Sequence, residues 1–211
     1  MRTRRPPFTR CNSGQSMVEI ALMLPLLLMV VLNAVNFGYF FLVAMNLAAA
    51  PRSGVEYAII GNSTPVRISL PLAGPRGAAG VASVSTLTNQ DMAGALSAPA
   101  TNASIQVCST SSDLGPLLNA GTPSARAPCA TFEATTPVGF TFPAAQPDPE
   151  LNSGNTAPAF VLTRVDVAYK FKPLIQGTPF NITLLASPIC SSASGSVTCT
   201  FHRQASMRAM N

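Results

Sequence analysis

The hydrophobic and polar positions of this chain fall into two patterns, and the first is one long apolar stretch near the N-terminus. From Ile20 to Phe41 only three side chains are polar, those of Asn33, Asn36 and Tyr39. About 20 apolar residues in a helix cross the roughly 30 Å hydrocarbon core of a bilayer, where a helix satisfies its own backbone hydrogen bonds. The pattern predicts a membrane-spanning helix over residues 15–50. Its length would be roughly 54 Å, so its last turns would project from the membrane.

The second pattern is an alternation of apolar and charged residues near the C-terminus, and it predicts β-strands. Along Val161–Phe171 one face carries Val161, Val165, Val167, Tyr169 and Phe171, and the other carries Arg164, Asp166, Lys170 and Lys172. A period of two is typical of a strand with one buried face. Two further strands are expected at Phe180–Ala186 and Val197–Ala205. Together they predict an antiparallel meander with its polar face in water.

Between these two regions the sequence is rich in Pro, Gly, Ser, Thr and Ala, so loops are expected to predominate. A short helix is expected at Asn89–Ser97, with Thr88 as its N-cap and Pro99 after its end. Ser104–Cys108 is expected to form a strand, and residues 109–158 loops with short strands at most. The predicted fold class is α+β: a long N-terminal transmembrane helix, then a small loop-rich domain with a C-terminal antiparallel β-meander.

Charge sets the orientation of the helix. Four arginines and no acidic residue lie in the first 14 residues, MRTRRPPFTRCNSG, and an excess of positive charge favours the cytoplasmic side. We therefore expect a cytoplasmic leader (1–14), a membrane helix (15–50) and an exported, periplasmic domain (51–211). Beyond the leader, nine basic and eight acidic residues nearly cancel. Nothing in the charge therefore favours nucleic acid as a partner.

The cysteines indicate an oxidising compartment. One of the five, Cys11, lies in the leader, and four remain in the expected exported domain: Cys108, Cys129, Cys190 and Cys199. An even number in an exported domain suggests disulfides. Of the three pairings, Cys108–Cys129 with Cys190–Cys199 is preferred because short loops close at low entropy cost; four buried thiols are the alternative. No metal site is expected, since there is no C-x-x-C motif and His202 is the only histidine.

Catalytic motifs are absent from the sequence. Four carboxylates are placed in expected loops, where such groups are mostly solvated: Asp113, Glu133, Asp148 and Glu150. The glycine-rich GPRGAAG at 74–80 does not lie between a strand and a helix, as a dinucleotide-binding turn must. The sequence therefore predicts neither an enzyme nor a cofactor.

One carboxylate, Glu19, lies at the start of the apolar stretch. A charge within a membrane is costly and usually has a partner or a function; the alternative is a carboxylate that reaches out to the cytoplasmic interface. Glu19 is the fifth residue after Gly14. A short basic leader that ends in Gly, a Glu five residues later and a long apolar helix together resemble type IV prepilins.

Within that class, the segment VEIALMLPLLLMVVLNAVNFGYF (18–40) resembles the TadE-like pseudopilins of the tight-adherence (Flp, type IVb) pilus system. The similarity includes the Val-Glu pair, the proline among leucines and the Asn-Phe-Gly triplet. AAAPRSGVEYAI (48–59) is a weaker match, with Pro51 at a position where the family usually continues the helix. The tail segments VDVAYKFKPLIQGTPF and RQASMRAMN also resemble the closing strands of the family.

The resemblance implies a structural role. A prepilin peptidase would cut after Gly14 and expose the amine of Gln15. Glu19 would then neutralise the new amine of a neighbouring subunit inside an apolar helix bundle. The implied partners are that peptidase, other pilin or pseudopilin subunits, the pilus assembly platform and the lipid of a bacterial inner membrane. Pilin architecture also implies that the C-terminal half of the long helix covers the inner face of the sheet.

Three alternatives compete with this interpretation. The chain would also suit a single-pass anchored binding domain that never assembles. The leader contains Thr3-Arg4-Arg5, which is similar to a twin-arginine signal, and Ala48–Ala50 is similar to a signal-peptidase site. Both of these signals normally accompany a shorter apolar region, and neither accounts for Glu19.

Overall fold

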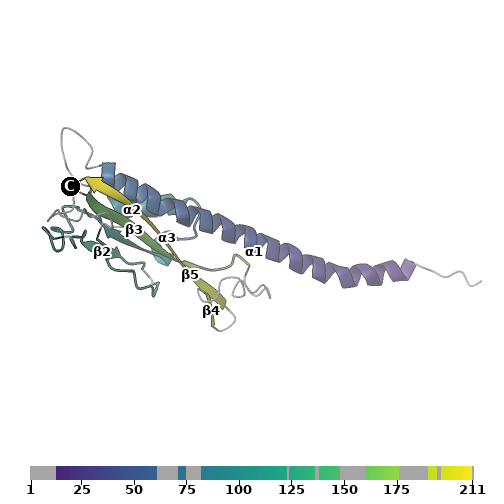
Figure 1. The fold of residues 1–211 in the computed structure, drawn as a ribbon. Coiled ribbons are helices and arrows are strands. Elements are labelled where there is room, and N and C mark those ends of the chain that lie inside the picture. Colours follow the sequence, from purple (N-terminus) through teal and green to yellow (C-terminus); the bar gives the residue numbers. More distant parts are fainter. Residues whose placement is uncertain are drawn as a thin grey trace, which may run out of the picture.

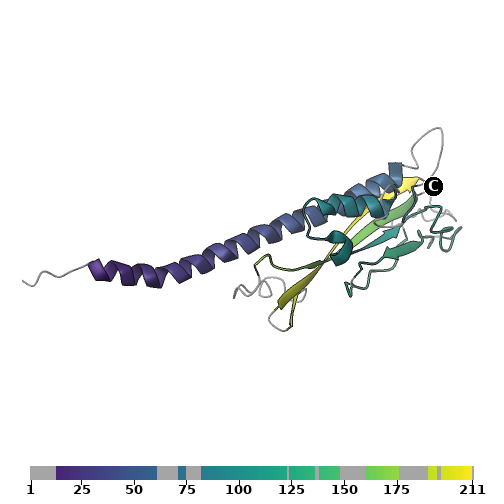
Figure 2. The ribbon, with the colours of Figure 1, turned by 180° about the vertical axis from the view of Figure 1, so that it is seen from behind.

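A computed structural model describes residues 13–60, 71–74, 82–122, 124–135, 138–147, 160–175, 190–193 and 196–210. One long helix lies along a five-stranded antiparallel sheet and extends far beyond it (Figure 1). Of two short helices in the described residues, the first lies beside the long helix and the second lies against the first and the sheet (Figure 2). The predicted α+β class with a long N-terminal helix is confirmed.

The long helix, α1, runs over Ser13–Ile60 and includes Pro25 and Pro51. The predicted end at residue 50 is therefore ten residues too early. A proline inside a helix removes one backbone hydrogen bond and costs roughly 3 kcal/mol. Beyond Pro51, however, Val55 and Ala58 are buried in the core, and their burial offsets that cost.

The strands form a sheet in the order β2-β1-β3-β5-β4. Their bounds are Ala103–Cys108 (β1), Cys129–Phe132 (β2), Phe160–Phe171 (β3), Cys190–Ala193 (β4) and Ser196–Met210 (β5). The predicted strands at 104–108 and 161–171 are confirmed, and the last strand begins one residue earlier and ends five residues later than expected. Strand β3 pairs directly with β5 along its whole length, from Phe160↔Met210 to Phe171↔Cys199. The strand expected at 180–186 lies outside the described residues.

The short helix was predicted too far along the chain. Helix α2 runs over Val84–Ala93 and is capped by Ser83, whose side chain accepts a hydrogen bond from the backbone N–H of Thr86. The expected cap, Thr88, lies inside the helix and is buried, with its hydroxyl bonded to the carbonyl of Val84. Tertiary packing thus overrides the low helix propensity of this β-branched segment. Pro99 begins a further short helix, α3 (Pro99–Asn102).

The main core lies between α1 and the inner face of the sheet. Helix α1 contributes Val43, Leu47, Ala50, Val55 and Ala58, and the sheet contributes Ile105, Val107, Val165, Val167, Tyr169, Phe171 and Phe201. The cover that was implied for the inner face of the sheet is therefore present. It comes from the C-terminal half of α1.

Candidate functional site

Helix α1 has two halves with different surroundings. From Ser16 to Val31 every described side chain is exposed, whereas Asn36 is buried and buried positions recur at least every four residues from Val43 to Ala58. We call Ser13–Val35 the free half and Asn36–Ile60 the docked half. Figures 1 and 2 show the free half projecting away from the sheet.

The free half is a largely apolar surface that the described part of the chain leaves mostly uncovered. Leu22, Met23 and Leu24 are 72%, 62% and 63% exposed. Among the described residues, α1 is the one helix long and apolar enough to cross a membrane, judged by length and composition. A continuous apolar surface of this size marks contact with lipid or with other proteins.

The residues singled out for processing and assembly lie at the start of the free half. Gly14 is exposed in the first turn of α1, and a Cβ at this position would meet nothing within 4 Å. Glu19 is exposed about one and a half turns further on. The backbone of Gln15 is four residues before Glu19, so these two positions lie on the same face of the helix.

A side-chain clamp marks the point where the free half ends. The amide of Asn36 donates to the carbonyl of Ile175 (3.1 Å) and accepts from its N–H (2.9 Å). Asn36 is only 1% exposed. Its side chain therefore pairs with the backbone after β3 as a neighbouring strand would, and it ties this segment to α1.

Aromatic rings pack immediately beyond the clamp. Phe40 contacts Phe171 and Phe201 with ring centroids 5.8 and 5.4 Å apart, and Tyr39 lies 5.6 Å from Phe171. Such pairs add to the energy of burial. They make the junction between helix and sheet a rigid, apolar contact.

The hydroxyls of two tyrosines meet at Ser97, between α2 and α3. Tyr169 Oη lies 3.2 Å from Ser97 Oγ, and Tyr39 donates to the same hydroxyl at 3.5 Å. Burial raises the pKa of Tyr169 and outweighs the opposing hydrogen bond from Ser97. This polar cluster satisfies the two phenols within an otherwise apolar interface.

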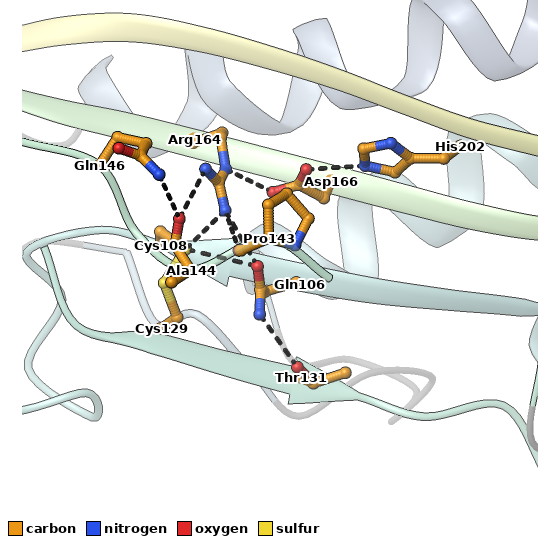
Figure 3. The surroundings of a disulfide bond; sticks show 10 residues. All are labelled: Gln106, Cys108, Cys129, Thr131, Pro143, Ala144, Gln146, Arg164, Asp166 and His202. Carbon is orange, nitrogen blue, oxygen red and sulfur yellow. Dashed lines mark hydrogen bonds and ion pairs between the residues drawn. A yellow bond between two sulfur atoms is a disulfide. The ribbon is translucent and has the colours of Figure 1, made fainter. Parts of the chain in front are cut away.

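A cluster of charged side chains lies on the outer face of the sheet, around Arg164 (Figure 3). Arg164 Nε donates to Asp166 Oδ2 at 2.6 Å, and His202 Nε2 lies 2.8 Å from Asp166 Oδ1. Arg164 also donates to the carbonyls of Pro143 and Ala144, at 2.6 and 3.1 Å. The guanidinium thus binds both the strand and the loop that crosses it.

This arrangement corrects the prediction that the polar face of β3 lies in water. Arg164 and Asp166 are 5% and 0% exposed. They are covered by residues 138–147, where Phe140 stacks on His202 with ring centroids 4.7 Å apart. The apolar run VGFTFPAA at 138–145 was the signal that could have revealed this cover. The cluster binds a loop to a sheet, and both of its charged residues on β3 are buried.

Two disulfides join neighbouring strands. Cys108–Cys129 joins β1 to β2, and Cys190–Cys199 joins β4 to β5. Each pair is also a paired position in the sheet register. These are the two local pairings that loop length favours.

The loop carboxylates serve the fold where they are described. Asp113 accepts hydrogen bonds from the N–H groups of Ala73 and Gly74, both at 3.0 Å. Partial burial raises its pKa, but these bonds and one to Ser111 lower it further, so the net shift is downward. Glu133 accepts from Ser104 at 2.8 Å. Asp148, Glu150 and residues 75–80 lie outside the described part of the chain, and within that part no three His, Cys, Asp or Glu side chains group to hold a metal.

A comparison with known protein families finds a match for the long helix. Residues 14–59 match the family model of TadE-like proteins, which confirms the resemblance for almost all of α1, including the part beyond Pro51. No curated protein matches the chain, and no solved structure matches it. The match begins at Gly14 and ends before the sheet domain. The similarity to TadE-like proteins is thus confined to the helix, and these comparisons match no part of the sheet.

Proposed function

We propose that this chain is a pilin-like structural subunit, a TadE-like pseudopilin, which a prepilin peptidase processes and which takes part in assembling a type IVb tight-adherence pilus. The observation that carries the proposal is the uncovered apolar free half of a TadE-like helix. The N-terminal arginines favour a cytoplasmic start, and the two disulfides fit a periplasmic domain.

The free half suits both stages of such a life cycle. About 20 residues, Ser16 to Val35, have the length of one bilayer crossing. Because these side chains are apolar on every side, they pack equally well against lipid or against the same helix of other subunits. Transfer from membrane to filament then exchanges one apolar environment for another.

Glu19 would fix how neighbouring helices align, because it is the one charged side chain of the apolar free half. After cleavage, the amine of Gln15 would be the only cation at this end of the mature helix. Within one chain it lies on the same face as Glu19, so an internal pair competes with the pair between subunits. In a filament, a carboxylate from a neighbour would neutralise the amine in a low dielectric, where an unpaired charge costs on the order of 3–5 kcal/mol.

The test compares two carboxylates of the same helix. Glu19→Ala should insert into the membrane normally but should not co-purify with pilus components, and Glu19→Gln should assemble poorly yet better than Ala. Glu56→Gln is the matched control, since Glu56 is an exposed carboxylate on the docked half. Normal incorporation of Glu19→Ala would remove the pairing mechanism.

Processing is tested separately by mass spectrometry of the mature N-terminus. We expect it to begin at Gln15, and a bulky or charged residue at Gly14 should prevent cleavage. Gly14→Ala should still be cut, because a Cβ there meets no neighbour. A wild-type protein that keeps its leader would instead support the second candidate, a single-pass anchored domain, which a helix of one bilayer length serves equally well.

A further inference from the structure

We propose that the segment after β3, Lys172–Ile175, seats the sheet domain on the periplasmic leaflet of the membrane, with Leu174 at the boundary of the acyl chains and Lys172 among the lipid phosphates. The inference rests on the proposed function, because it requires α1 to cross a bilayer. It adds a second point of membrane contact to the helix, one that sets how deep and how upright the subunit sits.

The length of the free half fixes the level at which α1 leaves the membrane. If the hydrocarbon begins at Ser16, about 20 residues bring its far boundary to Val35; if it begins after Glu19, the boundary lies near Tyr39. The first fully buried residue of α1 is Asn36. The far boundary of the membrane therefore coincides with the first turn of the docked half.

The Asn36 clamp places a loop of the sheet domain at that same level. Both hydrogen bonds of the clamp go to the backbone of Ile175. The neighbouring residue Leu174 must therefore lie within a few ångströms of this height along the helix axis. Figures 1 and 2 show the chain leaving β3 toward α1 on the side of the free half.

The side chains at this level suit an interface between hydrocarbon and headgroups. Leu174 is 62% exposed, although it belongs to an apolar type of residue, and Lys172 is exposed two positions before it. A lysine at this depth keeps its ammonium at the headgroups while its stem stays in the apolar layer. Contact with a membrane surface would thus account for the exposure of both Leu174 and Lys172.

Another face of α1 carries exposed apolar groups near this level. Phe37 and Phe41 are 38% and 49% exposed, and their rings meet edge to face at 4.7 Å. They lie about 100° and 140° around the helix axis from Asn36, with Phe41 roughly 7.5 Å further along it. Apolar side chains therefore surround the exit point, from the helix on one side and from the domain on the other.

The absence of tryptophan from the chain allows a direct test with single-tryptophan variants in proteoliposomes. The lipids are phosphatidylcholine and phosphatidylglycerol, brominated either near the headgroup or near the end of the acyl chain. Leu174→Trp and Phe41→Trp probe the proposed contact. Leu27→Trp reports the middle of the free half, and Ile60→Trp reports the far end of α1; both native residues are 58% exposed.

We expect Leu174→Trp and Phe41→Trp to lose most fluorescence to the shallow bromines, Leu27→Trp to the deep ones, and Ile60→Trp to neither. Emission of Leu174→Trp should also shift to shorter wavelength than that of Ile60→Trp. If Leu174→Trp behaves like Ile60→Trp while Leu27→Trp is quenched, the helix spans the membrane but the domain stands clear of it, and the inference fails alone. If Leu27→Trp is not quenched, the membrane span fails, and the inference with it.

Discussion

The two halves of α1 are built from similar apolar residues, yet they have opposite environments. The free half is dominated by leucine, valine and methionine and is largely apolar on every side, whereas the docked half carries small residues where it meets the domain, such as Ala50, Gly54 and Ala58. Large side chains all round leave no preferred face, which suits lipid or a bundle of equal helices. Small residues let one particular partner approach closely. The comparison shows that the small side chains of the docked half, and not total hydrophobicity, distinguish the helix surface that meets the domain from the one that is exposed.

The largest expected difference between the halves comes from truncating a leucine. Leu47→Ala should destabilise the sheet domain by about 2–5 kcal/mol, because Leu47 is 1% exposed and its loss leaves a cavity. Leu26→Ala removes the same atoms from the free half, where the domain makes no contact, and should leave domain unfolding unchanged. Denaturant titration of both full-length variants in the same detergent measures this difference. Equal losses would mean that the halves fold as one unit.

A glycine pair gives a second contrast of the same kind. A side chain at Gly54 would collide with the hydroxyl of Thr88, which comes from α2. Gly54→Leu should therefore cost about 1–3 kcal/mol through overpacking. Gly38→Leu is the control on the exposed side of the helix, where a Cβ meets nothing within 4 Å. The thermal midpoint of the domain should fall for Gly54→Leu and stay within experimental error for Gly38→Leu.

The boundary between the halves depends on Asn36. Asn36→Ala leaves the N–H and the carbonyl of Ile175 without their partner and should cost about 1–2 kcal/mol. Hydrogen exchange at the Ile175 amide should accelerate by a larger factor than at β3 amides. Asn46→Ala is the matched control, because that amide bonds only within the helix, to the carbonyl of Leu42 at 2.7 Å. An unchanged exchange rate at Ile175 would show that the clamp does not hold the segment.

Sequence reasoning succeeded where one local pattern decides the outcome. The apolar run predicted the helix, the alternation along Val161–Phe171 predicted β3, and the spacing of Gly14 and Glu19 pointed to the family. It failed where a distant partner decides. The end of the helix depends on core contacts beyond Pro51, and the burial of Arg164 depends on a loop some twenty residues earlier. A charged residue in an alternating strand is expected to be exposed to solvent unless the covering loop is recognised. The residues next to Arg164 in the sequence give no sign of that loop.

The smallest expected effect is a loss of stability at acid pH, and it should be confined to the sheet domain and the docked half of α1. The pKa of Asp113 is lowered in the folded chain, chiefly because the bonds to Ala73, Ser111 and Gly74 outweigh the raising effect of partial burial. A carboxyl with a depressed pKa stabilises the fold above its unfolded pKa, about 3.8, and loses that contribution as pH falls through the lower folded value. Ala73 is part of the core that α1 shares with the sheet, so this loss should loosen the domain and not the free half.

Asp113→Asn isolates this contribution. Above pH 5 the variant should be less stable than the wild type, because Ala73 and Gly74 donate to different carboxylate oxygens and the one amide oxygen can accept only one of these bonds. As the pH falls through the lowered folded pKa of Asp113, the two proteins should converge, since protonation removes the charge from the wild type. Unfolding curves at several pH values, with the helical signal of the free half followed in detergent, test both points. A gap that persists at low pH would show that the side chain acts through shape and not through charge, while a loss of free-half helicity with acid would contradict the independence of the two halves.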